Sequence, residues 1–192
     1  TNVTAAALNV TVVNPESPGF LTVYPCDAPR PLASNLNYGA GSVVANGVIA
    51  PVSVDGSVCI YTFVDSDVIV DLAGWFASSA FTGVVPKRLV DSRDGTGSVG
   101  GKLNTGSEVR VAVVGTSVTV GGTAVSVPSS AVAAVMNIVA VDVEGSGFMT
   151  VYPCGVSRPL TSNLNFSAGD VVANNVIAPV GADGQVCIYS SA

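Results

Sequence analysis

The chain has 192 residues, a net charge of −6 and an isoelectric point of about 4.2, and its seven Lys and Arg residues are scattered. This balance argues against nucleic acid and anionic membrane surfaces as partners, because both bind clustered cations. His is absent, so no Ser-His-Asp or Cys-His site can form within the chain, and the commonest zinc ligand is missing.

The first part of the chain predicts short β-strands separated by turns. Residues 5–13 are rich in β-branched side chains with partial alternation, which is typical of a strand. Residues 14–19 hold two prolines and a glycine and predict a turn. Pro25 ends the alternating run of residues 20–24, because proline cannot donate to a sheet. Further strands are predicted at residues 32–38, 43–50, 58–63 and 68–73.

The middle of the chain has a different composition. Residues 77–83 are small and polar and predict a linker, and residues 95–106 predict a glycine-rich loop. Strands are expected at residues 108–114, 118–120 and 124–127. Because no segment has a convincing helical period, we predict an all-β chain of β-sandwich or jelly-roll-like modules without substantial helix.

A long internal repeat organises the sequence. The segment GFLTVYPC at residues 19–26 returns as GFMTVYPC at residues 147–154, an offset of 147 − 19 = 128 positions. Without any gap, 36 of the 61 aligned pairs between residues 4–64 and 132–192 are identical. A repeat of this length indicates two related structural modules.

The two modules are expected at residues 1–80 and 81–192, and neither is complete. Residues 65–76 have no counterpart in the second copy, and residues 88–128 have none in the first. The sequence shows no initial Met and no signal peptide, so we expect a mature product or an excised fragment. Either it is a window of a longer array, or its halves complete each other within or between chains. Unpaired strand edges would invite strand addition.

Four cysteines allow three disulfide pairings. Repeat symmetry favours Cys26–Cys59 and Cys154–Cys187, each pair 33 residues apart. The alternative is four free buried thiols. Disulfides would indicate an oxidising, extracellular location.

A group of polar and aromatic side chains could bind carbohydrate by hydrogen bonding and stacking. The candidates are Tyr24, Arg30, Asn35, Asn37, Tyr38, Tyr152, Arg158, Asn163 and Asn165. The favoured alternative is that the asparagines satisfy backbone groups at loops and strand ends. Aromatic residues make up only 6% of the chain, so an extended stacking platform is not expected, and Trp75 is expected in the core or an interface.

Asp91 and Asp94 lie in a segment that superficially resembles a calcium loop, with a glycine turn at Gly95. We favour the alternative, in which one of these acids pairs with Arg88 or Arg93 and holds the loop. No metal site is therefore expected beyond these weak calcium candidates, and no cofactor.

Asp65, Asp67 and Asp71 alternate along one predicted strand. Paired carboxylates can serve glycoside hydrolysis. No other residue type supports such a site, so a solvated or loop-capping role is favoured and no catalytic residue is predicted.

Several motifs occur together in a fixed order. They are RLVDSRDGTG (88–97), VPSSAVAAVMNIVAV (127–141), both GFxTVYPC units, both SNLN units, both VCIY units and DVIVDLAGWF (67–76). This series resembles a repeat common in secreted and surface proteins of actinobacteria, over nearly the whole chain. The resemblance implies an extracellular location and modules joined in arrays. Relative to that repeat, the sequence starts within one module and stops before a second GWF.

These observations favour a non-enzymatic, extracellular structural or adhesive β-module of a cell-surface stalk, fibre or filament-like array. The expected partners are copies of itself or neighbouring repeats, and a cell-wall or surface glycan is a further candidate. No nucleic acid and no membrane insertion are expected. The alternative is a carbohydrate-binding module of a secreted enzyme or adhesin.

Overall fold

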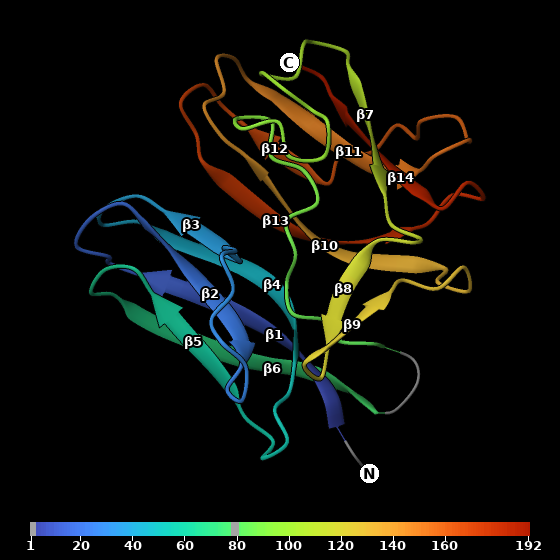
Figure 1. Ribbon diagram of the computed structural model, residues 1–192. Helices are drawn as coiled ribbons and strands as arrows, with labels where there is room; N and C mark the ends of the chain where they lie inside the picture. The colour runs from blue at the N-terminus through green and yellow to red at the C-terminus, as the bar shows by residue number, and fades with distance from the viewer. Residues whose placement is uncertain (1–2, 78–80) are drawn as a thin grey trace. The chain divides into compact units, whose positions relative to one another are not determined.

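A computed structural model describes residues 3–77 and 81–192 (Figure 1). This part of the chain is all-β, with fourteen strands, which confirms the predicted fold class. It contains no helix with the length and apolar character needed to cross a membrane. The chain divides into two compact units. The first comprises Thr1–Lys87, Thr119–Ala124 and Ala173–Asn175, and the second Arg88–Val118, Val125–Val172 and Val176–Ala192.

The first unit contains two antiparallel three-stranded sheets. One sheet has the order β4-β1-β6, with bounds Val43–Pro51, Val3–Val13 and Asp67–Ala77. The other has the order β3-β2-β5, with bounds Leu36–Tyr38, Gly19–Pro25 and Val58–Thr62. Side chains of both sheets meet in one core that includes Val10, Leu21 and Leu36. The two sheets therefore pack face to face as a sandwich.

The second unit also contains two sheets around one core. The larger has the order β12-β11-β14-β7, with bounds Leu164–Phe166, Gly147–Pro153, Gln185–Ser190 and Glu108–Ala112. The smaller pairs β10 with β13, with bounds Ala133–Ala140 and Val172–Pro179. The core includes Ile138 of β10, Val151 of β11 and Val186 of β14. A separate hairpin pairs β8 (Ser117–Val120) with β9 (Thr123–Ser126).

The sequence repeat corresponds to the same strand pairing in the two units. Adding 128 positions carries β1 to β10, β2 to β11, β3 to β12, β4 to β13 and β5 to β14. The register follows the same offset, because Pro25 pairs with Val58 in the first unit and Pro153 with Val186 in the second. The shared residues thus specify the same five-strand framework twice.

Each five-strand framework also pairs with one further strand that has no counterpart among the described residues of the other framework. In the first unit β6 pairs with β1, and in the second β7 pairs with β14. The counterpart of β14 is β5, and the counterpart of β1 is β10. Within the described residues, β5 and β10 therefore each have one edge that no strand pairs with.

One predicted strand is shorter in the structure. The alternation of residues 32–38 predicts one continuous strand, but only Leu36–Tyr38 forms a strand. Asn35 lies just before it and uses its side chain to bind the neighbouring strand, as described below. Alternation of side chains alone does not reveal such a side-chain competitor for backbone pairing. Residues 78–80 of the predicted linker lie outside the described residues.

Candidate functional site

Two asparagines of the repeated SNLN segment, one in each unit, hold a loop against the strands β2 and β11. The Asn35 Oδ1 accepts a hydrogen bond from the Val23 N–H at 2.7 Å, and Asn163 accepts one from Val151 at the same distance. On the same strands, the buried Thr22 hydroxyl donates to the Ala33 carbonyl at 2.6 Å. Its counterpart Thr150 donates likewise to Thr161 at 2.6 Å. Asn35 and Asn163 therefore have the structural role that the sequence favours, because their side chains satisfy backbone groups beside a strand.

The other carbohydrate candidates do not share one surface. Tyr38 and Tyr152 are buried, and the Tyr38 hydroxyl donates to the Phe20 carbonyl at 3.2 Å. Asn37 is half-buried with an amide nitrogen that has no hydrogen-bond partner among the described atoms, whereas Asn165 is exposed. Tyr24 is half-buried.

Arg30 and Arg158 instead stack on two tyrosines that are not among the predicted carbohydrate candidates. The Arg30 guanidinium lies 3.8 Å from the ring centroid of Tyr61, and Arg158 lies 3.9 Å from that of Tyr189. Phe20 adds ring contacts to Tyr61 and Phe63, with centroids 5.9 and 5.3 Å apart. We call Phe20, Arg30, Tyr61 and Phe63 the first aromatic cluster.

The second unit repeats this arrangement in part. Phe148 and Tyr189 have ring centroids 6.1 Å apart, and Arg158 covers Tyr189. Phe63 has no aromatic counterpart, because Ser191 stands at that position of the repeat. The sequence did contain a signal for the tyrosines, since both VCIY segments alternate and so place Cys and Tyr on the face opposite Val and Ile.

Both disulfides are present, between Cys26 and Cys59 and between Cys154 and Cys187. Each has a sequence separation of 33 residues, and closing a loop of this length stabilises a chain by about 4 kcal/mol. Their surroundings differ. Cys26 is exposed and Cys59 half-buried, whereas Cys154 and Cys187 are only 2% and 1% exposed.

The strand β7 explains this difference. Arg110 pairs with Cys187 and Glu108 with Tyr189, so β7 covers this edge of β14. The Tyr152 hydroxyl donates to Glu108, and a Glu108 carboxylate oxygen lies 3.4 Å from the Cys187 sulfur. Burial, together with the neighbouring Glu108 carboxylate, raises the pKa of Tyr152 to about 12. Arg110 lies 3.8 Å from Glu108 and 3.6 Å from Asp183.

The weak calcium candidates are engaged within their own loop. The Asp91 carboxylate binds Arg88 at 2.7 Å and Arg93 at 2.8 Å, which are the ion pairs favoured from the sequence. Hydrogen bonds from Arg93 hold the pKa of Asp91 well below its ordinary value. Asp94 accepts a hydrogen bond from the Thr96 N–H at 2.9 Å. Across residues 3–77 and 81–192, no three Cys, Asp or Glu residues are grouped to hold a metal ion.

The acids at positions 65, 67 and 71 lie on β6 and just before it. Asp67 and Asp71 lie on β6 opposite Val13 and Asn9, and both are exposed. Four residues along a strand span about 13 Å, which exceeds the separation of about 5–9.5 Å used by glycoside hydrolases. Asp65 is exposed in a bend before this strand.

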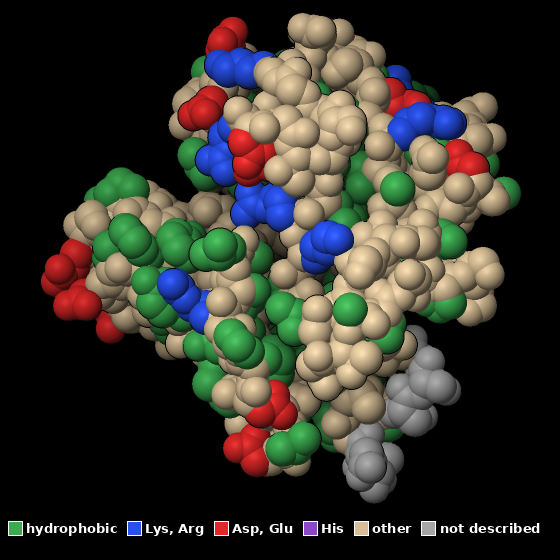
Figure 2. All heavy atoms as spheres, in the orientation of Figure 1, with side chains coloured by type: hydrophobic (Ala, Val, Ile, Leu, Met, Phe, Trp, Pro, Cys, Tyr) green, Lys and Arg blue, Asp and Glu red, His purple; other side chains and the backbone are tan. Residues whose placement is uncertain are grey.

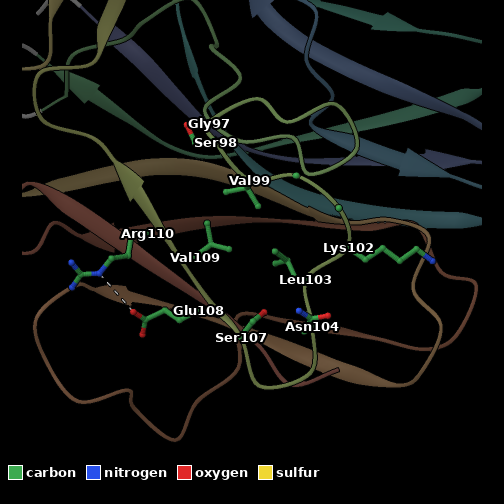
Figure 3. Close-up of a pocket in the computed structure, with 12 residues that line it drawn as sticks. Gly97, Ser98, Val99, Lys102, Leu103, Asn104, Ser107, Glu108, Val109 and Arg110 are labelled. Atoms are coloured by element: carbon green, nitrogen blue, oxygen red, sulfur yellow. Dashed lines mark ion pairs between the residues drawn. The ribbon is translucent and has the colours of Figure 1, made fainter.

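A shallow depression of about 490 Å³ lies within the second unit, between the loop at residues 97–107 and β7 (Figure 3). Val99, Leu103 and Val109 face one another across it, whereas Lys102 points away from it. Glu108 and Arg110 lie together at its other side. This arrangement places apolar side chains at the centre of the depression and charged side chains at its margin.

Comparisons of this chain with protein-family models, curated proteins and solved structures found no match.

Asn35→Ala removes the acceptor for the buried Val23 N–H. We expect this variant to lose about 1–3 kcal/mol of unfolding free energy, measured by urea denaturation. Asn165→Ala is the matched control at the exposed second asparagine of the other SNLN segment, and it should change stability by less than about 0.5 kcal/mol. Equal losses in the two variants would contradict the bracing role.

Asp91→Asn removes the carboxylate that binds Arg88 and Arg93. Because the folded pKa of Asp91 is lowered, its stabilising effect is complete above the unfolded value of about 4 and is lost as the pH falls through the lowered pKa. We therefore expect the variant to be less stable than wild type at neutral pH, with a difference that shrinks below about pH 4. Urea denaturation at stepped pH measures this.

The exposed Lys102–Glu144 ion pair provides the control for Asp91. Glu144→Gln should change the unfolding free energy at neutral pH by less than about 1 kcal/mol. A difference between Asp91→Asn and wild type that does not vary with pH would contradict the electrostatic explanation.

The two disulfides should differ in their rates of reduction. A thiolate must reach a sulfur atom to attack it, so Cys26–Cys59 should be reduced on the order of tenfold faster than Cys154–Cys187. Alkylation followed by mass spectrometry of each cysteine measures the two rates. In denaturant the rates should converge, and faster reduction of the buried pair in the folded chain would contradict this expectation.

Proposed function

We propose that this protein is a non-enzymatic, extracellular structural or adhesive β-module that contributes to a cell-surface stalk, fibre or filament-like array. The observation that carries this proposal is the pair of strand edges on β5 and β10. Each lacks a partner among the described residues, at the position where the other unit has a strand. Unpaired edges are templates for pairing with another chain.

Two further features support an extracellular assembly role. The disulfides are typical of proteins from oxidising environments. The sequence motifs resemble repeats of secreted and surface proteins of actinobacteria, which occur in arrays.

The surface composition also favours contact with other molecules. Charged residues make up 10% of the chain, compared with about 25% in typical soluble domains. Hydrophobic side chains lie at the surface of the first unit in Figure 2. On β6, Ile69, Leu72 and Trp75 are more than half exposed. Large exposed apolar residues on one strand are typical of an interaction surface.

A carbohydrate-binding module remains the alternative function, and the first aromatic cluster favours it. Phe63 is exposed and stacks on Phe20, so the two rings could contact the face of a sugar. Arg30, however, already covers one face of Tyr61. We therefore rank self-association above sugar binding.

Sedimentation velocity of the full chain over a wide concentration range tests the proposal. We expect the weight-average sedimentation coefficient to rise with concentration. Val139 lies on β10 between the buried Ile138 and Ala140, so its side chain faces away from the core. A lysine on an edge strand opposes edge pairing, so Val139→Lys should weaken the association.

Val125→Lys serves as the matched control, because Val125 is an exposed valine of β9, a strand that lies outside the repeated framework. It should leave the association unchanged. A chain that stays monomeric at every concentration would contradict the self-association proposal, and saturable binding on a glycan array would then favour the carbohydrate alternative.

A further inference from the structure

We propose that the free edge of β5 binds an extended strand of the Glu108–Ala112 type, presented by a neighbouring molecule that carries the same repeat. The strand would take the register that β7 takes on β14. This inference rests on the proposed function, since it names the partner of the β5 edge on which that proposal depends. Three independent observations support it: the backbone of β5, the apolar face of β6 and the polar groups beside the exposed disulfide.

The backbone of β5 has hydrogen-bonding groups directed away from β2. Phe63 donates to the Phe20 carbonyl at 3.0 Å. Hydrogen-bonded pairs alternate along an antiparallel ladder, so the backbone groups of Tyr61 and Cys59 also point to β2. The backbone groups of Ile60 and Val58 therefore point to the open edge.

The counterparts of Ile60 and Val58 in the second unit are Ile188 and Val186, which pair with Val109 and Val111 of β7. There the ladder continues past β14, because Ser190 donates to the Ser107 carbonyl at 3.0 Å. The same backbone pattern is thus occupied by a strand in one unit and open in the other.

The apolar face of β6 is uncovered where a strand beyond β5 would lie. Leu72 pairs with Leu8 and Val70 with Val10, so these side chains share the core-facing side of the sheet. Leu8 and Val10 are buried, yet Val70 is 42% and Leu72 65% exposed. The opposing sheet ends at β5 and does not extend over them.

A strand of the β7 type has the side chains to close this end of the sandwich. In β7, Val109 and Val111 are buried while Glu108, Arg110 and Ala112 are exposed, which is an alternation of apolar and polar positions. In the same register on β5, the two valines would lie on the side of Ile60 and Val58 that faces β6. They could then contact Leu72 and Val70.

The polar side chains of β7 would also find their second-unit partners on the first unit. Glu108 binds Tyr152, whose counterpart Tyr24 makes no side-chain hydrogen bond among the described residues. Arg110 approaches Asp183, whose counterpart Asp55 is exposed. A strand alternating valine with Glu and Arg therefore matches this edge in its apolar side chains, its polar side chains and its backbone pairing.

A synthetic peptide of residues 104–116 added to the full chain tests the inference. We expect saturable binding that slows amide hydrogen exchange at Val58 and Ile60, followed by NMR, by about tenfold or more. We also expect slower reduction of Cys26–Cys59, with no change at Cys154–Cys187, because the bound strand would cover only the first disulfide.

Matched variants identify the contact surface. Leu72→Ser should weaken peptide binding by about tenfold, because it removes an apolar side chain that the peptide would bury. Leu32→Ser is the control, since Leu32 is 90% exposed on the loop before β3 and does not lie on β6. A peptide with aspartate in place of both valines should not bind.

Three outcomes would overturn the inference: no saturable binding, slowed exchange at Val186 and Ile188 alone, or equal binding by Leu72→Ser and wild type. These outcomes are separate from the test of self-association. A monomeric chain that still binds the peptide at β5 would contradict the proposed self-association and support the strand acceptor. A chain that associates but does not bind the peptide at β5 would support the proposed self-association and contradict the strand acceptor.

Discussion

The structure depends on the central strands β2 and β11, each of which bonds to a neighbour on both sides. Their alternation sends Leu21 and Val23, or Val151, into the core while Thr22 or Thr150 turns to the opposite side. That opposite side is also covered, because the loop containing Asn35 or Asn163 crosses it and supplies a hydrogen bond to the strand. A disulfide follows each strand, so these strands hold sheet, loop and core together.

The five-strand framework is repeated but the added strands β6 and β7 are not. The two units therefore differ in which framework strand has an unpaired edge among the described residues. The cover that β7 provides accounts for the burial of Cys154 and Cys187. Within residues 3–77 and 81–192 no strand covers this edge of β5, which accounts for the exposure of Cys26. The same difference leaves Leu72 of β6 exposed on a core-facing side. The unpaired backbone of β5, the exposed Cys26 and the exposed Leu72 all belong to the first unit. Together they link the fold of that sandwich to the proposed assembly role.

The candidate site was only partly predictable. The residue types of Arg30 and Arg158 suggest hydrogen bonding to sugar, yet each lies over a tyrosine that follows the second cysteine of its disulfide by two residues. The stacking joins segments that are distant in sequence, so no local pattern reveals it. Tyr38 and Tyr152 looked suitable for a surface but are buried, because strand alternation cannot say which face a second sheet or a loop will cover.

The sequence by itself determined the all-β class, the two repeated frameworks and the favoured pairing of the cysteines, because period-two alternation, turn residues and an ungapped repeat are local or self-referring signals. It also indicated the Asp91 ion pairs, since Arg88 and Arg93 lie within three residues of the acid. Only the tertiary structure decided that β6 adds to β1 and β7 to β14, and hence which disulfide is buried and which edges are open. Those outcomes depend on pairing between strands separated by dozens of residues, and the alternation within a strand does not specify its neighbour.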